Sequence, residues 1–382
     1  MERNCTKSEE ISELLRNEIL SGKFDGTNKL PSEHQLMRRF SVARETVRAA
    51  IMNLQGKHLV DRRPGYGTFL SAGATMRARE KIGLIVPESE IDFYWRICRG
   101  VEERAHARGW SVLTAPCGYG TMRERFARAM AFVDVCVRER VAGVLVQPVQ
   151  FLKDSLSLNR GLCEALAHAG LQIGLIDSDY LEFPERSDYD ITCSDSFVIG
   201  HRLARHVISR GARRIVYLAY PFSAPTAFNR VNGIANAVLD AGLPWGEGNV
   251  IFGFPTDMKL MRRVFLSKSR PDAVICTGDS IAADLLPTLA ALGLRVPEDV
   301  LVAGVNGDMV GAQATPPVTT AVQPCHQIGC AAFDMLLERI RDPGLAPRTQ
   351  MFNAQVVVRK STDRRSERGS RKSARTARKD RK

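Results

Sequence analysis

Two arginines one helical turn apart are the side chains of this sequence best placed to bind a polyanion. Arg44 and Arg48 stand four positions apart with Thr46 between them, and that spacing sets both arginines on one face of a helix. A guanidinium group can donate two hydrogen bonds to O6 and N7 of guanine, and a threonine can reach a phosphate or a thymine methyl group. Two arginines on a helix more often form only a solvated face, so the neighbouring elements must decide between the interpretations.

Three short helices are predicted around these side chains. Apolar residues recur with helical spacing over 8–20, over 31–40, and in a third segment that ends at Gly56. Pro31 suits a helix start, and Gly56 suits a helix C-cap. The third helix is expected to bury the side opposite the two arginines, which carries Val47, Ala50, Ile51 and Leu54.

A basic hairpin is predicted directly after the third helix. The segments 58–62 and 67–70 have strand character, and the turn between them contains Gly65 and Gly67, which tolerate positive φ angles. Arg62 and Arg63 place positive charge near its tip. A helix that enters the major groove beside such a loop is a common DNA-binding arrangement.

The motifs LPSE, V-x-R-x-TVR and G-x-GTF occur here in that order. Over about residues 8–71 the sequence resembles the GntR family of winged helix-turn-helix regulators. The resemblance implies DNA contacts from a set of recognition-helix and wing residues: Arg44, Thr46, Arg48, Gly65, Tyr66 and Gly67. His34 stands where the family often has a longer polar side chain for a phosphate contact. Ala43 replaces the usual Ser or Thr, and losing that N-cap costs about 0.5–2 kcal/mol of helix stability.

The positive charge is concentrated at the two ends of the chain. The 382 residues carry a formal charge of +12, of which residues 1–80 supply +4 and residues 363–382 supply +7. The near-neutral middle argues against nucleic-acid binding along the whole length. The last segment has no apolar residue larger than alanine, so we expect a disordered tail that either solubilises the chain or attracts DNA phosphates non-specifically.

Cysteine usage and hydropathy indicate a cytoplasmic protein. The nine cysteines are scattered and form no C-x-x-C pair, which favours free thiols in a reducing compartment. Cys325, His326 and Cys330 are close in sequence, but cysteines on a helix face are a better interpretation than a metal site. The first fifteen residues lack the apolar core of a signal peptide, and no run approaches the roughly 18–20 apolar residues that span a bilayer. We expect no metal, no cofactor and no membrane contact.

From Lys81 onward, apolar runs alternate with helical segments. Examples of these runs are KIGLIVP, VAGVLVQP, LQIGLID, RRIVYLAY, DAVICTG and DVLVAGV. This alternation predicts βαβ units, parallel sheets and an α/β fold, in which ligands bind at the carboxyl ends of strands. Polar residues stand at the ends of these runs, namely Gln147, Asp177, Asp279 and Asn306. Arg230 is expected just before a helix. Each alone is more often a solvated loop residue, but together they favour a cleft for a hydroxyl-rich ligand.

The segments NRVNGIANAVLDAGL, GLRVPEDVLVAGVNGD and PPVTTAVQPCHQIG resemble the LacI/GalR effector domain. The resemblance covers about 81–362 and implies two α/β lobes of the periplasmic-binding-protein type. It implies a ligand cleft that includes Asp177, Arg230, Asn306 and Gln323, with the aromatic residues Phe93 and Tyr94 near the ligand or in the core. Gly278 and Asn306 replace the family's usual Asn and Asp, which alters the hydrogen bonds available to a ligand.

These resemblances define the expected domains. Residues 1–71 form the winged helix, 72–80 a linker, 81–362 the effector domain and 363–382 the tail. One lobe is expected at about 81–193 and 323–350, and the other at about 194–322 and 351–362.

The expected function is transcriptional regulation controlled by a small molecule. We expect a homodimer that binds a near-palindromic operator and represses carbohydrate-utilisation genes under the control of a sugar or a related small effector, which either releases the protein from DNA or recruits it. One alternative is a solute-binding protein. Another is an enzyme with a regulatory head, although we find no catalytic triad, phosphate-binding loop or dinucleotide-binding motif.

Overall fold

The computed structural model describes residues 6–20, 23–24, 27–71, 80–88, 91–182 and 184–364. Contacts divide the chain into two compact units, which are described separately. The first extends to Ile82 and takes in 109–111 and 136–142, and the second contains the remainder of the effector region. All but Glu80 of the predicted linker, and residues 365–382 of the predicted tail, lie outside the described residues.

The first unit is a helical domain with a two-stranded wing. Its elements are α1 (Lys7–Leu20), α2 (Glu33–Phe40), α3 (Arg44–Gly56), β1 (Val60–Arg63) and β2 (Gly67–Leu70). Strands β1 and β2 pair antiparallel, with Val60 opposite Leu70 and Arg63 opposite Gly67. The predicted apolar side of α3 is buried against apolar side chains of α1, and the core includes Ile11, Leu15, Ile19, Leu36, Val47, Ala50, Ile51 and Leu54.

Two predicted helix ends lie elsewhere. Helix α2 begins at Glu33, not at Pro31, because Ser32 and Gln35 form a capping box that satisfies free N–H groups of the first turn. Gly56 is the last residue of α3, and the cap is Lys57 with an ordinary negative φ. The positive φ that follows the helix is taken by His58, at 54°.

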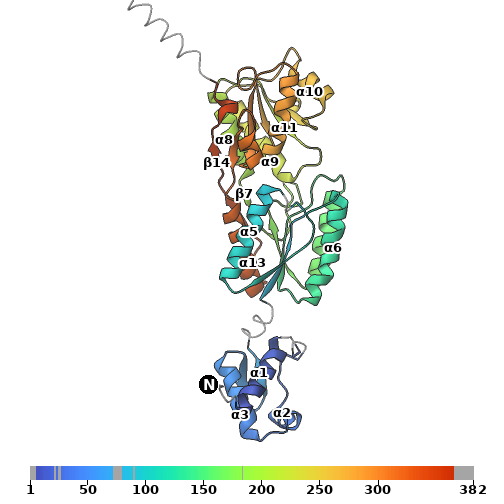
Figure 1. The fold of residues 1–382 in the computed structure, drawn as a ribbon, viewed down its shortest axis with the longest axis vertical. Coiled ribbons are helices and arrows are strands. Elements are labelled where there is room, and N and C mark those ends of the chain that lie inside the picture. The colour runs from blue at the N-terminus through green and yellow to red at the C-terminus, as the bar shows by residue number, and fades with distance from the viewer. Residues whose placement is uncertain are drawn as a thin grey trace, which may run out of the picture. The chain divides into compact units, whose positions relative to one another are not determined.

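The second unit consists of two lobes, each built on a six-stranded sheet (Figure 1). The first lobe has the strand order β13-β7-β6-β5-β3-β4. Its strands are β3 (Lys81–Ile85), β4 (Ser111–Thr114), β5 (Gly143–Val146), β6 (Gln172–Ile176), β7 (Asp190–Ser194) and β13 (Thr349–Phe352). Its helices are α5 (Asp92–Ala107), α6 (Met122–Arg138), α7 (Ser155–His168) and α13 (Cys325–Arg341). Figure 1 shows α5 and α13 side by side on one face of the sheet and α6 toward the other.

The second lobe has the strand order β14-β12-β11-β10-β8-β9. Its strands are β8 (Ile215–Ala219), β9 (Val250–Phe252), β10 (Ala273–Cys276), β11 (Leu301–Asn306), β12 (Thr319–Val322) and β14 (Gln355–Val357). Its helices are α8 (Ser196–Ser209), α9 (Pro225–Asp240), α10 (Met258–Phe265), α11 (Asp279–Ala291) and α12 (Met309–Gln313), with short 3-10 turns at Glu247–Asn249 and Lys360–Thr362. In the described chain, the connections β7–α8, β12–α13 and β13–β14 pass between the lobes. Strand β13 belongs to the first lobe and ends at Phe352, whereas the sequence placed the end of this lobe at about residue 350.

Helices on both faces explain why the strands are apolar throughout. Tyr217 of β8 packs toward α8 and α9, whereas its neighbours Val216 and Leu218 pack toward α10 and α11. Alternate residues of a strand point to opposite faces, so a sheet covered on both sides needs apolar residues at every position.

Helices α8 and α9 approach closely at glycines, and this contact fixes the backbone that carries Arg230. A Cβ atom at Gly200 would lie 2.1 Å from the Arg230 carbonyl oxygen. A Cβ atom at Gly233 would lie 1.9 Å from the carbonyl oxygen of Phe197. Larger residues at either position would push the helices apart and move Arg230.

Candidate DNA-binding surface and ligand cleft

Three arginines of the first unit converge on one carboxylate. Glu33, the first residue of α2, accepts hydrogen bonds from Arg44 Nε at 3.0 Å, Arg48 Nε at 3.3 Å and Arg62 Nη2 at 2.8 Å. Arg44 and Arg48 therefore do share a face of α3, and Arg62 of the wing strand joins them. Because Glu33 comes from a different helix, the sequence periodicity of α3 gave no signal for this contact.

The surrounding arginines lower the pKa of Glu33, with the Arg44 hydrogen bond as the largest cause. The ion pairs are solvent-exposed, with the Arg44 side chain 62% exposed, so each contributes little to stability. Their effect is to hold three guanidinium groups in one place. A phosphate or a guanine edge can then replace Glu33 as the acceptor for one or more of them.

The wing turn has the backbone that its glycines suggested. Gly65 has φ 78° and Gly67 has φ 113°, and the Tyr66 N–H donates to the Arg63 carbonyl at 3.0 Å. The Tyr66 side chain is 75% exposed. The Arg63 guanidinium lies 4.8 Å from the centre of the Phe69 ring. This cation–π contact favours a position of the positive charge near the turn.

The remaining predicted DNA contacts lie near the start of α3 and in α2. Thr46 is half-buried, and His34 is exposed on α2 beside Glu33. Ala43 is the N-cap of α3 and makes no side-chain cap hydrogen bond, so the expected loss of the cap is confirmed.

In the first lobe of the second unit, five polar side chains form a connected network. The Gln147 and Gln150 amides donate to one Glu88 oxygen at 2.8 and 2.7 Å. Gln150 also donates to the Tyr94 hydroxyl at 2.8 Å, and that hydroxyl donates to Asp177 at 3.0 Å. The network brings together Gln147, Tyr94 and Asp177 as the sequence suggested. Glu88 and Gln150 were not anticipated, although Glu88 directly follows the apolar run KIGLIVP and Gln150 lies two residues after VAGVLVQP.

Asp177 is a strongly perturbed acid of this network. Burial raises its pKa to about 6, although the Tyr94 hydrogen bond and the charge of Arg230 act in the opposite direction. Asp177 also has a positive φ of 73°. Non-glycine residues in that region cost free energy and often occur at ligand sites.

The second lobe contributes donors and acceptors of its own. Arg230 is buried, and it donates to the Thr277 carbonyl at 3.0 Å and to the Ser196 hydroxyl at 3.4 Å. Its Nε has no partner among the described residues, which leaves capacity for a ligand acceptor or a water. Asn306 accepts from Gln323 at 2.9 Å and donates to Asp308 at 3.1 Å.

Two predicted ligand residues face the protein interior in this conformation. Phe93 is buried and packs edge-on against Tyr94, with the ring centres 4.8 Å apart. Asp279 is fully buried at the start of α11, where it accepts the Asp308 N–H at 2.7 Å. A Cβ atom at Gly304 would lie 2.2 Å from an Asp279 oxygen, so the strand backbone closes over this carboxyl group. Asp279 therefore holds the turn after β11.

Burial raises the pKa of Asp279 to about 7, and this shift predicts a pH-dependent stability. The unfolded chain releases this proton near pH 4, whereas the folded chain retains it to about pH 7. Its contribution is therefore fully present at low pH and is lost as the pH rises toward 7. Between pH 5 and pH 7.5, wild type should lose up to about 3 kcal/mol relative to Asp279→Asn, which stays neutral. Urea unfolding of both proteins across this range measures the difference, and parallel pH profiles would contradict it.

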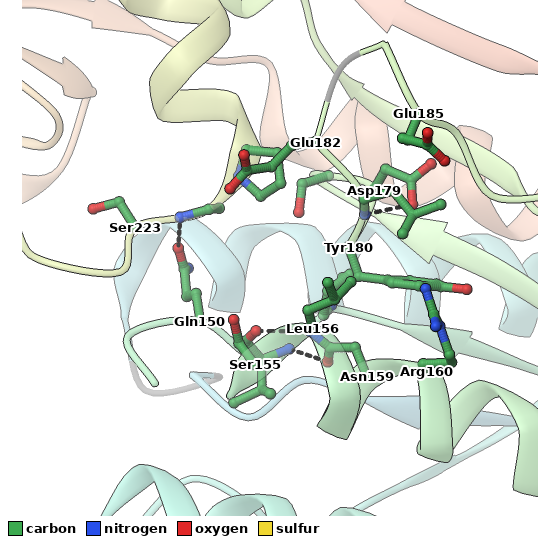
Figure 2. Close-up of a pocket in the computed structure, with 16 residues that line it drawn as sticks. Gln150, Ser155, Leu156, Asn159, Arg160, Asp179, Tyr180, Glu182, Glu185 and Ser223 are labelled. Atoms are coloured by element: carbon green, nitrogen blue, oxygen red, sulfur yellow. Dashed lines mark hydrogen bonds between the residues drawn. The ribbon is translucent and has the colours of Figure 1, made fainter. Parts of the chain in front are cut away.

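A cavity of about 410 Å³ lies beside the polar network (Figure 2). The first lobe supplies Gln150, Asn159, Arg160 and Tyr180, and the second lobe supplies Ser223. Gln150 belongs both to this wall and to the network, and its Oε1 accepts the Ala224 N–H of the second lobe at 3.2 Å. The volume lies within the roughly 300–1,000 Å³ range of small-molecule sites.

A second cavity of about 520 Å³ includes Asp177 in its wall. Most of the other predicted ligand side chains are buried, and the two lobes are in contact. The Phe151 N–H donates to the Phe222 carbonyl at 2.7 Å between the lobes. A ligand that reaches Arg230 and Gln323 therefore requires the lobes to open.

Neither a membrane-spanning helix nor a metal cluster is found among the described residues. His326 bonds to Glu103 at 2.8 Å, and its other ring nitrogen lies 3.7 Å from Cys330 Sγ. Cys325 is buried and directs its thiol to the Gln323 carbonyl.

Comparisons with known proteins match the two parts of the chain separately. Residues 7–70 match the bacterial regulatory proteins of the gntR family, and residues 204–362 match the periplasmic binding protein-like domain. The transcriptional repressor PurR of Pasteurella multocida is 25% identical over 342 residues, which are 89% of this chain and 96% of that protein. PurR of Vibrio atlanticus is 28% identical over 282 residues, which are 73% of this chain and 80% of that protein.

Solved structures support the same fold. The regulator CelR in complex with cellobiose matches with a TM-score of 0.63 and 23% identity, covering 84% of this chain and 91% of that one. A LacI-family regulator from Mycobacterium smegmatis matches with a TM-score of 0.61 and 24% identity, covering 73% of this chain and 98% of that one. The predicted winged helix and two-lobed α/β effector domain are confirmed.

Proposed function

We propose that this chain, a transcriptional regulator that joins a GntR-family DNA-binding domain to a periplasmic binding protein-like domain, is a repressor. A sugar or a related polyhydroxylated effector releases it from its operator. The observation that carries the proposal is the pairing of two sites in one chain. One is a basic surface around Arg44, Arg48 and Arg62, and the other consists of hydrogen-bonding side chains in both lobes, such as Asp177 in the first and the buried Arg230 in the second.

On the DNA side, α3 enters the major groove and the wing lies beside it. Arg44 and Arg48 contact base edges or phosphates, Thr46 and His34 contact the backbone, and Gly65, Tyr66 and Gly67 place the wing against the duplex. The protein acts as a homodimer, so the operator is near-palindromic. The relatives named as repressors favour repression over activation.

On the effector side, the ligand enters between the lobes and exchanges protein hydrogen bonds for its own. Asp177 accepts from ligand hydroxyl groups, and Arg230 donates to ligand oxygens. Asn306 and Gln323 can do both. Tyr94 and Gln147 hold Asp177 and Glu88 in position, and Gln150 connects the site to the adjacent cavity.

We also propose how the chain is divided and where it acts. Residues 1–71 bind DNA, 81–362 bind the effector and dimerise, and the cytoplasm is the compartment in which bacterial DNA is reached. Enzymatic activity and solute transport are less favoured, because the relatives are named as regulators.

A thermal-shift screen tests the effector class. Purified full-length protein is heated with single monosaccharides, disaccharides and, as a contrasting class, nucleobases. We expect a sugar to raise the midpoint temperature of the effector domain, because a ligand that binds only the folded state stabilises it. A midpoint raised by a nucleobase and by no sugar would contradict the sugar assignment, while leaving ligand control in place.

A further inference from the structure

Arg96 of α5 reaches from the first lobe to the second. Its Nη2 donates to the Asn306 carbonyl oxygen at 3.1 Å and lies 3.2 Å from an Asp308 carboxylate oxygen. On its own helix, Arg96 Nε donates to the Asp92 carbonyl at 3.3 Å. One side chain thus ties the first turn of α5 to the turn that follows β11.

The contact is more enclosed than the surface ion pairs of this protein. The Asp308 side chain is 5% exposed and the Arg96 side chain 26% exposed. A charge pair that is shielded from water is screened less by salt than an exposed one. Removing one partner would also leave a largely buried carboxylate without its countercharge.

The turn that Arg96 holds carries a predicted ligand residue. Asn306 has φ 103° and Gly307 has φ 74°, so two consecutive residues occupy the left-handed region. Asn306 also bonds to Gln323 and to the Asp308 carboxylate, and the Asp308 N–H bonds to Asp279. Arg96 therefore acts on the position of Asn306 through its carbonyl and through Asp308, although it lines neither described interlobe cavity.

Two other hydrogen bonds between the lobes form at a different place. The Phe151 N–H donates to the Phe222 carbonyl at 2.7 Å, and the Ala224 N–H donates to Gln150 Oε1 at 3.2 Å. Both donors are backbone amides. Their exchange with solvent deuterium therefore reports lobe opening at sites that Arg96 does not touch.

We propose that Arg96 is a positioning residue that latches the two lobes together in the absence of effector, through the Asn306 carbonyl and the Asp308 carboxylate. The latch sets the fraction of molecules with closed lobes and holds Asn306 in its ligand-binding position. Loss of the latch shifts the population toward open lobes. Because a ligand reaches Arg230 and Gln323 only when the lobes open, the apparent effector affinity is then expected to rise in proportion to the open fraction.

Hydrogen–deuterium exchange of the full chain without effector tests the latch. Arg96→Ala is expected to accelerate exchange in peptides containing Phe151 and Ala224 by about 10- to 100-fold, because a charge-assisted contact is lost. Exchange in β10, at the centre of the second sheet, should stay unchanged. Arg99→Ala is the matched control, since this arginine lies one turn further along α5 and pairs with Glu103 of the same helix.

Arg96→Lys distinguishes loss of the latch from a general loss of stability. Lysine keeps the charge beside Asp308 but cannot present a planar fork to two acceptors, so its exchange rates should fall between those of wild type and Arg96→Ala. Rates at Phe151 and Ala224 that are unchanged in Arg96→Ala would overturn the proposal. So would equal acceleration in Arg99→Ala, or acceleration of β10 to the same degree.

Only the effector-affinity part of this inference rests on the proposed function. The exchange measurement contains no effector, so it can succeed even if the ligand is not a sugar. If the latch is absent while a sugar still controls DNA binding, the inference fails and the proposed function stands.

Discussion

Replacing Arg44 or Arg48 with alanine is expected to weaken operator binding by about 10- to 100-fold and to leave effector affinity unchanged. Each arginine can make a bidentate base contact or a phosphate contact, and the loss of one such contact costs about 1–3 kcal/mol. Both guanidinium groups are already held on the exposed face of α3 by Glu33. The substitutions should cost little stability, because the side of α3 that packs into the domain is the opposite one.

Lys57→Ala is the control for this experiment. Lys57 is an exposed cation of the same domain that pairs with Glu13, so the variant loses the same charge away from the proposed recognition surface. Fluorescence anisotropy at two salt concentrations separates a general electrostatic loss from a specific one. If both arginine variants bind the operator as Lys57→Ala does, α3 is not the recognition helix.

Arg230→Ala is expected to abolish the effector response while operator binding persists. The guanidinium is buried in the second lobe and retains an unpartnered Nε among the described residues. Hydrogen bonds from a charged donor to a ligand contribute about 1.5–3 kcal/mol each, so effector affinity should fall by about 100-fold. The variant should also lose some stability, because the Thr277 carbonyl loses its donor.

Arg359→Ala distinguishes a ligand contact from a loss of stability. Arg359 is a half-buried arginine of the same lobe, and it also donates to a backbone carbonyl, that of Val318, at 2.8 Å. Calorimetry of effector binding should show normal affinity for Arg359→Ala and strongly reduced affinity for Arg230→Ala. Equal affinities in the two variants would remove Arg230 from the ligand site.

The elements that carry these residues were predictable because their patterns are local. The apolar stripe of α3 and the glycines of the wing define one domain, and the alternation of apolar strands with helices defines the other. Helix ends were less predictable. Competing caps stand within two residues of each other at Pro31 and Ser32, and only the bonds to Gln35 decide between them.

The closed cleft was less predictable, because it depends on contacts between distant parts of the sequence. Arg96 and Asp308 are 212 positions apart, and no spacing rule connects them. The interior position of Asp279 likewise depends on the backbone at Gly304 packing against it. Strand-end position alone suggests a ligand contact for Asp177 and Asp279 equally, and only tertiary packing distinguishes them.

Ligand control requires that the two sites influence each other reciprocally. If the effector alters operator affinity by a given factor, the operator must alter effector affinity by the same factor. A change in lobe closure that is favoured by the effector and opposed by the operator-bound dimer would produce this coupling. The Arg96 latch would then set the ratio of open to closed lobes before the effector binds.

The most direct test of the central claim is an operator titration by fluorescence anisotropy with and without a saturating sugar found in the thermal-shift screen. The account predicts that the sugar weakens operator binding by about 5- to 150-fold, the range of typical allosteric couplings. Arg230→Ala should show no change under the same conditions. An operator affinity that is unaltered by every ligand that binds the effector domain would contradict ligand-controlled repression.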